Sequence, residues 1–205
     1  LLREIHHRVK NNLQIISSLL YLQSVNVSDP FTTGILMECR SRVKAMALIH
    51  EKLYRSKDLS HIPFVTYMEN LIDSLKDSFG VTDDIIAIDI SVDPPDLTLN
   101  VETGIPCGLL INELLSNALK YAFPGGRTGR IRLEMHRADP HDYTLIVSDN
   151  GAGFPKDVDF KNTLSLGLQL VNNLVTQLDG TITLDGTNGT TFYIRFRGIE
   201  DSLNE

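Results

Sequence analysis

The sequence predicts an α+β protein in which a pair of long N-terminal helices precedes a mixed β-sheet covered by helices. Two patterns indicate this fold. In residues 1–55, apolar side chains recur every three or four positions, as in helices that pack along a seam. After residue 84, short stretches of alternating apolar and polar residues are separated by turn signals, as in strands with short connections. Short connections favour antiparallel neighbours.

Length and composition fit a soluble protein with one large domain or two small ones. The chain has 205 residues, of which 42% are hydrophobic and 22% charged. Its net charge of −7 argues against nucleic-acid binding, which normally requires a basic surface. No apolar run reaches the roughly 18 residues of a membrane span, so we expect no direct membrane contact. Cys39 and Cys107 lie in apolar helical contexts, which favours free thiols in a reducing compartment, here the cytoplasm.

The first two helices are predicted to form an αα-hairpin joined at the turn Ser28-Asp-Pro30. Such a hairpin buries little by itself, so we expect two chains to pair as a four-helix bundle. Because the chain begins inside a helical pattern, we also expect it to be a fragment whose upstream sensor domain is missing. The first seam comprises Leu2, Ile5, Val9, Leu13, Ile16 and Leu20, and the second comprises Leu36, Cys39, Val43, Met46, His50 and Leu53.

Two adjacent histidines occupy different sides of the first helix. His6 lies at the edge of the apolar seam, whereas His7 projects about 100° further round, on the polar side with Asn11. His7 should therefore face water, where a neutral imidazole nitrogen is available as a nucleophile, its free pKa being about 6.5. The alternative is that both are incidental surface histidines. His50, on the second seam, is expected to be partly buried and structural.

The seam pattern stops near residues 55–60, which predicts a boundary between a hairpin domain at 1–58 and a second domain at 59–205. An amphipathic helix follows at 64–79 and ends at Gly80. The remaining predicted elements are strands at 85–92 and 97–99, a helix that begins between 101 and 106, strands at 130–136 and 143–148, a helix at 164–178, and strands at 181–184 and 190–197.

The segment 111–121 gives its helix two unlike faces. One arc of roughly 140° is polar, and the opposite arc is apolar. Amide oxygens are suitable ligands for Mg²⁺, and a lysine beside them suits a polyphosphate. An ordinary amphipathic helix with a mixed polar face is the alternative. The polar arc comprises Asn112, Glu113, Ser116, Asn117 and Lys120.

Three later segments carry glycines at chemically useful places. Asp149 ends a strand, and its carboxylate can accept a hydrogen bond from an exocyclic amine such as that of adenine. The segment 165–168 opens a helix, whose N-terminus can seat a phosphate. The segment 189–192 places hydroxyls beside a turn that leads into a strand. A plain turn and a simple helix start are the alternatives for the first two. Neither the dinucleotide-binding nor the phosphate-loop glycine pattern is present.

In order and spacing over residues 62–198, these four segments resemble the nucleotide-binding boxes of the GHKL ATPase superfamily, which includes gyrase-type, chaperone-type and histidine-kinase ATPase domains. The resemblance implies a GHKL-type α/β sandwich, ATP and Mg²⁺ as cofactors, and a short lid at 154–166. It implies nucleotide contacts by Asn112, Asn117, Lys120, Tyr121, Asp149, Gly151, Gly153, Ser165, Leu166, Gly167, Leu168 and Thr190, with Asn112 holding Mg²⁺.

The stretch 4–14, Glu-Ile-His-His-Arg-Val-Lys-Asn-Asn-Leu-Gln, resembles the phosphoacceptor helix of sensor histidine kinases, in the variant related to the HWE class with the motif His-Arg-x-Lys-Asn. The motif places the phosphorylated histidine at His7, as does the position of His7 on the helix. Commoner histidine kinases carry an acidic residue directly after the histidine, and here that residue is Arg8. The general base stays open between Glu113, which we weakly favour, and Glu4.

The resemblance implies a protein-histidine kinase of a two-component system, which autophosphorylates His7 from Mg-ATP and passes the phosphoryl group to an aspartate of a response-regulator receiver domain. Asn11 would orient water or the phosphoryl group, or it is only a polar surface residue. A hinge is expected at 55–62, since His7 must reach the nucleotide. The alternative is a GHKL-type ATP-dependent conformational or scaffold module without phosphotransfer.

Overall fold

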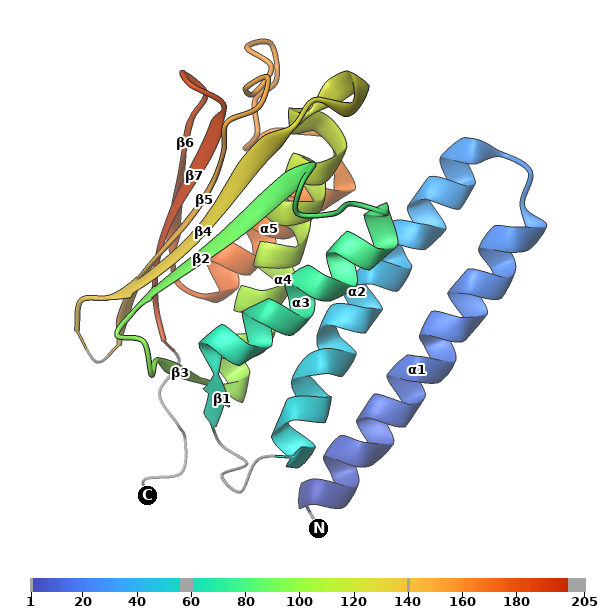
Figure 1. The fold of residues 1–205 in the computed structure, drawn as a ribbon. Coiled ribbons are helices and arrows are strands. Elements are labelled where there is room, and N and C mark those ends of the chain that lie inside the picture. Colours follow the sequence, from blue (N-terminus) through green and yellow to red (C-terminus); the bar gives the residue numbers. More distant parts are fainter. Residues whose placement is uncertain (1, 56–60, 140, 199–205) are drawn as a thin grey trace.

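The computed structural model describes residues 2–55, 61–139 and 141–198 (Figure 1). Helices α1 (Leu2–Asn26) and α2 (Pro30–Arg55) form the antiparallel hairpin that the sequence predicts. Asp29 caps the second helix, because its Oδ2 accepts a hydrogen bond of 2.8 Å from the Thr32 backbone nitrogen. Hydrogen bonds from the Thr32 side chain and backbone lower the pKa of Asp29.

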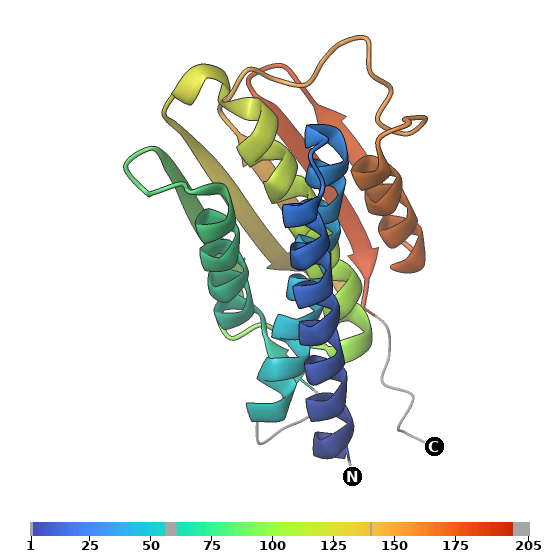
Figure 2. The same ribbon diagram turned by 90° about the vertical axis from the view of Figure 1, so that its right-hand side faces the viewer.

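A row of large apolar side chains on the hairpin remains exposed. Helix α1 packs along α2, but α1 lies outermost and faces away from the rest of the molecule (Figure 2). Of the predicted first seam, Val9, Leu13 and Leu20 are half-buried, whereas Ile5 and Ile16 are exposed, and the most exposed row lies beside that seam. The most exposed apolar side chains of the hairpin are Ile15, Leu19, Leu22, Val25 and Phe31.

Helix α3 (Phe64–Phe79) has the bounds predicted from its apolar spacing. It ends at Gly80, which adopts the left-handed conformation at φ 63° and donates its backbone N–H to the Lys76 carbonyl. A short strand not expected from the sequence, β1 (His61–Pro63), precedes it and pairs with β3 (Thr98–Asn100) in a separate two-stranded sheet. A strand of this length has no room for a period-two pattern.

The main sheet has five strands in the order β2-β4-β5-β7-β6. Strands β2 and β4 are parallel and the other neighbours are antiparallel, which confirms a mixed sheet. The strand pairs joined by short turns, β4 with β5 and β6 with β7, are antiparallel as predicted. Strands β2 and β4 are parallel because the long connection through the next helix returns the chain to the starting end of β2. The strands are β2 (Ile86–Asp93), β4 (Gly129–Arg137), β5 (Asp142–Asp149), β6 (Thr181–Asp185) and β7 (Thr190–Arg197).

Helices α3, α4 (Val101–Asn117) and α5 (Leu166–Gln177) cover one face of this sheet, and the hairpin packs on the helices through α2 (Figures 1 and 2). Side chains of β4 and β5 alternate between buried and more exposed, as expected for a sheet covered on one face. Helix α4 lies between the sheet and α2, so nearly all its side chains from Thr103 to Ser116 are buried. The polar ones among them consequently need partners.

The chain does not leave α4 as a regular α-helix. Residues Ala118–Ala122 form a π-helical turn, whereas the sequence predicted one continuous α-helix through Tyr121. The wider turn changes the direction of the last side chains, and Tyr121 is 69% exposed. Single π turns inside helices are rare and frequently occur at functional sites.

Several sequence predictions concern the limits of the domains and the thiols. The predicted boundary at 58/59 and most of the hinge at 55–62 fall on residues 56–60, outside the described residues.

Cys39 and Cys107 are free, as expected, and burial raises the pKa of Cys107 to about 12. Within the described ranges, no helix combines the length and hydrophobicity needed to cross a membrane.

The close contact between α3 and α4 provides a test of the packing. A Cβ on Gly108 would lie 1.8 Å from the hydroxyl oxygen of the buried Tyr67, so Gly108→Ala should lower the free energy of unfolding by about 1–3 kcal/mol. A Cβ on Gly34 in α2 would have no atom within 4 Å, so Gly34→Ala should raise the free energy of unfolding by up to about 1 kcal/mol. Urea denaturation measures both, and equal effects would contradict the packing.

Candidate nucleotide-binding site

A cavity of about 600 Å³ lies between the C-terminal end of β5, the N-terminal end of β7, the π turn and the start of α5. Its volume lies within the range of small-molecule sites. Most of its wall is apolar, and polar groups lie at its edges, an arrangement that suits a flat base with a few hydrogen-bonding atoms. The apolar wall includes Leu114, Ala118, Ala122, Val147, Leu168 and Phe192.

Asp149 supplies a carboxylate to this cavity. It is the last residue of β5 and is only 8% exposed. Its Oδ1 accepts hydrogen bonds from the backbone nitrogens of Gly151 (2.9 Å) and Thr190 (3.2 Å). These two bonds fix the carboxylate and leave Oδ2 to accept from a ligand. The position is therefore suited to an exocyclic amine.

The loop after β5 depends on a close approach at Gly151. A Cβ there would lie 2.3 Å from the carbonyl oxygen of Ala122, and the next residue, Ala152, donates its N–H to that oxygen at 2.8 Å. The loop is thus held against the π turn. Gly153 and Thr190, for which nucleotide contacts were predicted, line the cavity.

A second, smaller cavity of about 200 Å³ lies between α2, α4 and the start of α5. Asn117, Tyr121 and Ser165 line both cavities, so the two adjoin. A base in the larger cavity would direct its phosphates into the smaller one. The polar row of α4 lines the smaller cavity, and the members of that row are Asn112, Glu113, Ser116, Asn117 and Lys120.

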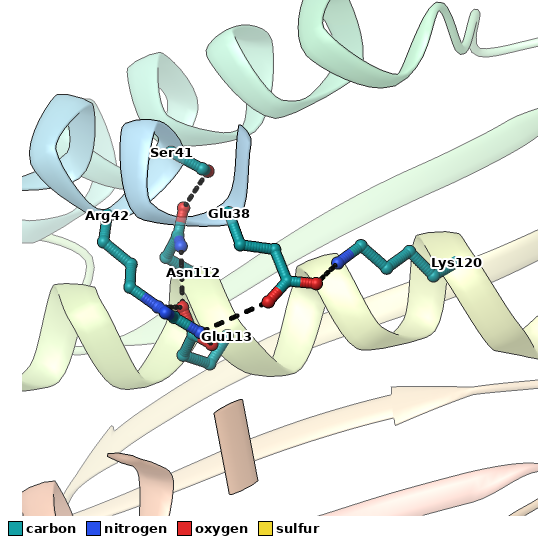
Figure 3. A network of polar contacts seen from close by, with 6 residues as sticks. All are labelled: Glu38, Ser41, Arg42, Asn112, Glu113 and Lys120. Atoms are coloured by element: carbon teal, nitrogen blue, oxygen red, sulfur yellow. Dashed lines mark hydrogen bonds and ion pairs between the residues drawn. The ribbon is translucent and has the colours of Figure 1, made fainter. Parts of the chain in front are cut away.

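Helix α2 contacts this polar row through a network of hydrogen bonds and ion pairs (Figure 3). Ser41 Oγ donates to Asn112 Oδ1 at 3.1 Å. Glu38 forms an ion pair with Lys120. The guanidinium of Arg42 pairs with Glu113, Nε donating to Oε1 at 2.8 Å and Nη2 to Oε2 at 2.7 Å. Asn112 and Lys120, which the sequence assigned to the nucleotide, and the candidate base Glu113 thus have protein partners.

The centre of the network is buried. Asn112 is 1% exposed, Glu113 5% and Arg42 9%. The hydrogen bonds from Arg42 to Glu113 raise the pKa of the guanidinium. A charge in such a place is strongly destabilising when its partner is removed, so the pairing holds α2 against α4.

The start of α5 also lines the smaller cavity, through Ser165 and Gly167. A Cβ on Gly167 would lie 2.8 Å from Glu113 Oε2, so only a glycine lets the helix come this close. Ser165 stands at the N-cap without a side-chain cap hydrogen bond. With Leu166 and Leu168 it forms the helix start at which the sequence predicted a phosphate, and helix N-termini favour anions.

The predicted lid at 154–166 is an irregular loop. Its Phe154 and Phe160 contact Phe192 edge-on, at centroid distances of 6.1 and 5.9 Å. Asn172 Nδ2 donates to the Phe160 carbonyl at 2.8 Å. The middle of the loop is thus anchored, while Leu164 at its end is 99% exposed.

His7 is exposed on α1, as predicted from its position on the helix. The amide of Asn11 lies one turn away, with Nδ2 3.4 Å from His7 Nδ1. Arg8 pairs with Glu4 at 2.7 Å on the exposed face of the same helix. His50 is half-buried, in line with a structural role.

The structure does not bring His7 to the nucleotide residues. Lys10 Nζ lies 3.2 Å from Glu51 Oε2, so the first turns of α1 lie level with Glu51 of α2. Glu38, which reaches Lys120, is on the same helix as Glu51, and at about 1.5 Å per residue the two positions are about 20 Å apart. His7 precedes Lys10 on α1 and so lies still further from Glu38. The N-terminal end of α1 lies at the end of the molecule opposite the lid (Figure 1).

Sequence reasoning missed the α2 side of the site. The sequence analysis gave no role to Glu38, Ser41 and Arg42, yet they recur at spacings of three and four and so share one helix face. That spacing was a signal for a second, polar contact face on α2.

The fold and the site define an ATPase domain of the class shared by histidine kinases, gyrase and chaperones. Residues 102–198 match the family described as histidine kinase-, DNA gyrase B- and HSP90-like ATPase, which implies ATP binding. Residues 4–79 match the family described as histidine kinase. The chain therefore belongs to the histidine kinases.

Individual relatives agree with this assignment. The sensor histidine kinase PdtaS of Mycobacterium tuberculosis is 32% identical over 187 residues, which are 88% of this chain and 36% of that protein. Blue-light-activated histidine kinase 2 of Erythrobacter litoralis is 31% identical over 199 residues, which are 92% of this chain and 54% of that protein. The chain thus spans about a third to a half of these curated relatives.

Solved structures show the same fold. The Erythrobacter litoralis EL346 blue-light-activated histidine kinase superposes with a TM-score of 0.69 at 28% identity, covering 94% of this chain and 60% of that chain. The Acinetobacter baumannii histidine kinase AdeS, at 17% identity and a TM-score of 0.55, shares the fold.

The role of Asp149 can be tested by binding. Asp149→Asn places an amide N–H or a weaker acceptor opposite the adenine amine, so the dissociation constant for ADP should rise about tenfold or more. Isothermal titration calorimetry measures it, with Asp73→Asn on the exposed face of α3 as the control. Unchanged ADP affinity in Asp149→Asn would remove Asp149 from the base site.

Proposed function

We propose that this chain is the catalytic core of an ATP-dependent protein-histidine kinase, which phosphorylates His7 from Mg-ATP and transfers the phosphoryl group to an aspartate of a response-regulator receiver domain. The observation that carries the proposal is the exposed His7 on a hairpin that belongs to the same chain as the Asp149 cavity. Such a module acts where ATP is supplied, which agrees with a cytoplasmic location.

The polar row of α4 fits a magnesium-bound triphosphate. Mg²⁺ prefers oxygen ligands and is usually bound through a few protein groups together with substrate phosphates and water. Asn112 Oδ1 would hold the ion, with Asn117 beside it, and Lys120 would pair with the phosphates. When bound, Mg²⁺ draws negative charge from the β- and γ-phosphates. Positioning and electrostatics supply most of the catalysis in such phosphoryl transfers.

Asn11 orients the imidazole. Its Nδ2 lies 3.4 Å from His7 Nδ1 and donates to it, so Nε2 carries the ring proton, points outward, and gives that proton to the general base as it attacks the γ-phosphorus. Both candidates for the general base are paired, Glu4 with Arg8 and Glu113 with Arg42. We assign the base to Glu113, since the nucleotide site itself carries it.

The reaction requires the two parts of the chain to move. His7 must come to the smaller cavity from more than about 20 Å away. A hinge at 55–62 between a hairpin domain at 1–58 and an ATP-binding domain at 59–205 is therefore part of the proposal. The exposed apolar row of the hairpin supports pairing of two chains. An upstream sensor domain would act on the same hairpin.

Phosphorylation at His7 has a direct test. Full-length chain incubated with Mg²⁺ and γ-labelled ATP should gain acid-labile, base-stable label that His7→Gln abolishes and His6→Gln retains. The measurement is label retained on the protein after acid or base treatment. Label that survives in His7→Gln would refute the assignment, and nucleotide binding without any label would favour the GHKL-type conformational or scaffold module.

The metal role of Asn112 predicts a difference between two binding experiments. Asn112→Ala should weaken binding of ATP in the presence of Mg²⁺ by about tenfold or more, with little change in EDTA, because only the metal-dependent contact is lost. Asn26→Ala at the end of α1 is the matched control. Equal affinities for Mg-ATP in Asn112→Ala and the unmodified chain would contradict the role.

A further inference from the structure

One face of α2 already occupies the phosphate end of the nucleotide site (Figure 3). Three groups on the α4 side that were assigned above to metal, base or phosphate have an α2 partner: Asn112 accepts from Ser41, Glu113 pairs with Arg42, and Lys120 pairs with Glu38. The three α2 residues, Glu38, Ser41 and Arg42, are called the α2 polar face below.

The carboxylate of Glu38 has the chemical character of a phosphate at this place. It carries negative charge, pairs with Lys120, and lies 3.7 Å from the guanidinium of Arg42. Lysine and arginine are the side chains that usually hold phosphate oxygens. A phosphate of ATP would therefore need the same lysine that Glu38 now occupies.

The shapes of the two cavities separate the base from the phosphates. The larger cavity is lined by residues 114–192 and by no described residue of the hairpin, so a nucleoside can enter it with α2 in place. The smaller cavity has α2 as one wall and α4 as the other, so a phosphate placed there meets the α2 polar face.

A buried hydroxyl also points to a ligand in the smaller cavity. Ser116 lines that cavity and is 8% exposed, yet its Oγ has no hydrogen-bond partner among the described residues. Buried hydroxyls are normally satisfied. A phosphate oxygen or a metal-bound water would satisfy this one, whereas the seated α2 leaves it without a partner.

From these contacts we infer that the α2 polar face is a built-in competitor of Mg-ATP, in which the Glu38 carboxylate takes the place of a phosphate. The inference rests on the proposed function, because it assigns Lys120 and Asn112 to the bound triphosphate. When Mg-ATP binds, Glu38 leaves Lys120, Ser41 leaves Asn112, and α2 separates from α4. The same event frees Glu113 from Arg42 and releases the hairpin that carries His7.

The charges of the network balance when α2 is seated on α4 and no ligand is bound. Glu38 and Glu113 supply two negative charges, and Arg42 and Lys120 supply two positive ones. A triphosphate adds negative charge beside Glu38, which repels it, so the seated helix and the ligand disfavour each other. Binding of either one thus lowers the apparent affinity of the other.

The test is the affinity of the Mg²⁺ complex of a non-hydrolysable ATP analogue, measured by isothermal titration calorimetry on the full chain. Glu38→Gln removes the competing charge and should lower the dissociation constant about threefold or more. Adenosine, which lacks phosphates, should bind Glu38→Gln and the unmodified chain equally. Glu69→Gln on the exposed face of α3 is the matched control and should change neither constant.

Ser41→Ala, which removes only the hydrogen bond to Asn112, should shift the affinity in the same direction as Glu38→Gln. Equal or weaker analogue binding by Glu38→Gln, while the unmodified chain binds normally, would overturn the inference and leave the proposed function intact. A tightening seen equally with adenosine would overturn it too, since the competitor acts on phosphates. Absence of nucleotide binding in every variant would overturn both.

Discussion

The polar side chains of α4 lie in a buried layer, and buried charges and amides must be paired. Helix α4 is enclosed by the sheet on one side and α2 on the other. Asn112 Nδ2 donates to Glu113 Oε1 at 3.3 Å within α4, and the further partners of Asn112 Oδ1 and of the Glu113 carboxylate come from α2 or from a ligand. In this structure α2 satisfies them. The place of the hairpin follows from that pairing, as does the separation between His7 and the nucleotide site.

The features predicted well are those encoded locally. The polar row of α4, the aspartate at the end of β5 and the glycine at the start of α5 each arise from a short run of residues, and the structure gathers them around two adjoining cavities. The outward position of His7 follows from helix geometry alone. The bounds of α3 could likewise be predicted from the sequence, because the apolar spacing and a terminal glycine mark them.

The features missed depend on contacts between distant segments. The hydrogen bonds between α2 and α4 join residues 71 positions apart. The spacing of polar residues within α2 does not predict which helix its polar face contacts. The parallel pairing of β2 with β4 depends on the course of α4 between them. The π turn moves Lys120 and Tyr121 off the regular helical path, because local sequence preferences do not distinguish it from an α-helical turn. The hinge stays a prediction from the sequence.

In the proposed competition, α2 and the triphosphate are alternative partners of one helix face. A crystal structure with Mg²⁺ and a non-hydrolysable ATP analogue tests this competition most directly. It predicts metal at the Asn112 amide oxygen, a phosphate oxygen at Lys120, and the loss of the Glu38 and Arg42 ion pairs. A structure in which the complete Mg-triphosphate is bound while Ser41 still contacts Asn112 and Glu38 still contacts Lys120 would contradict it.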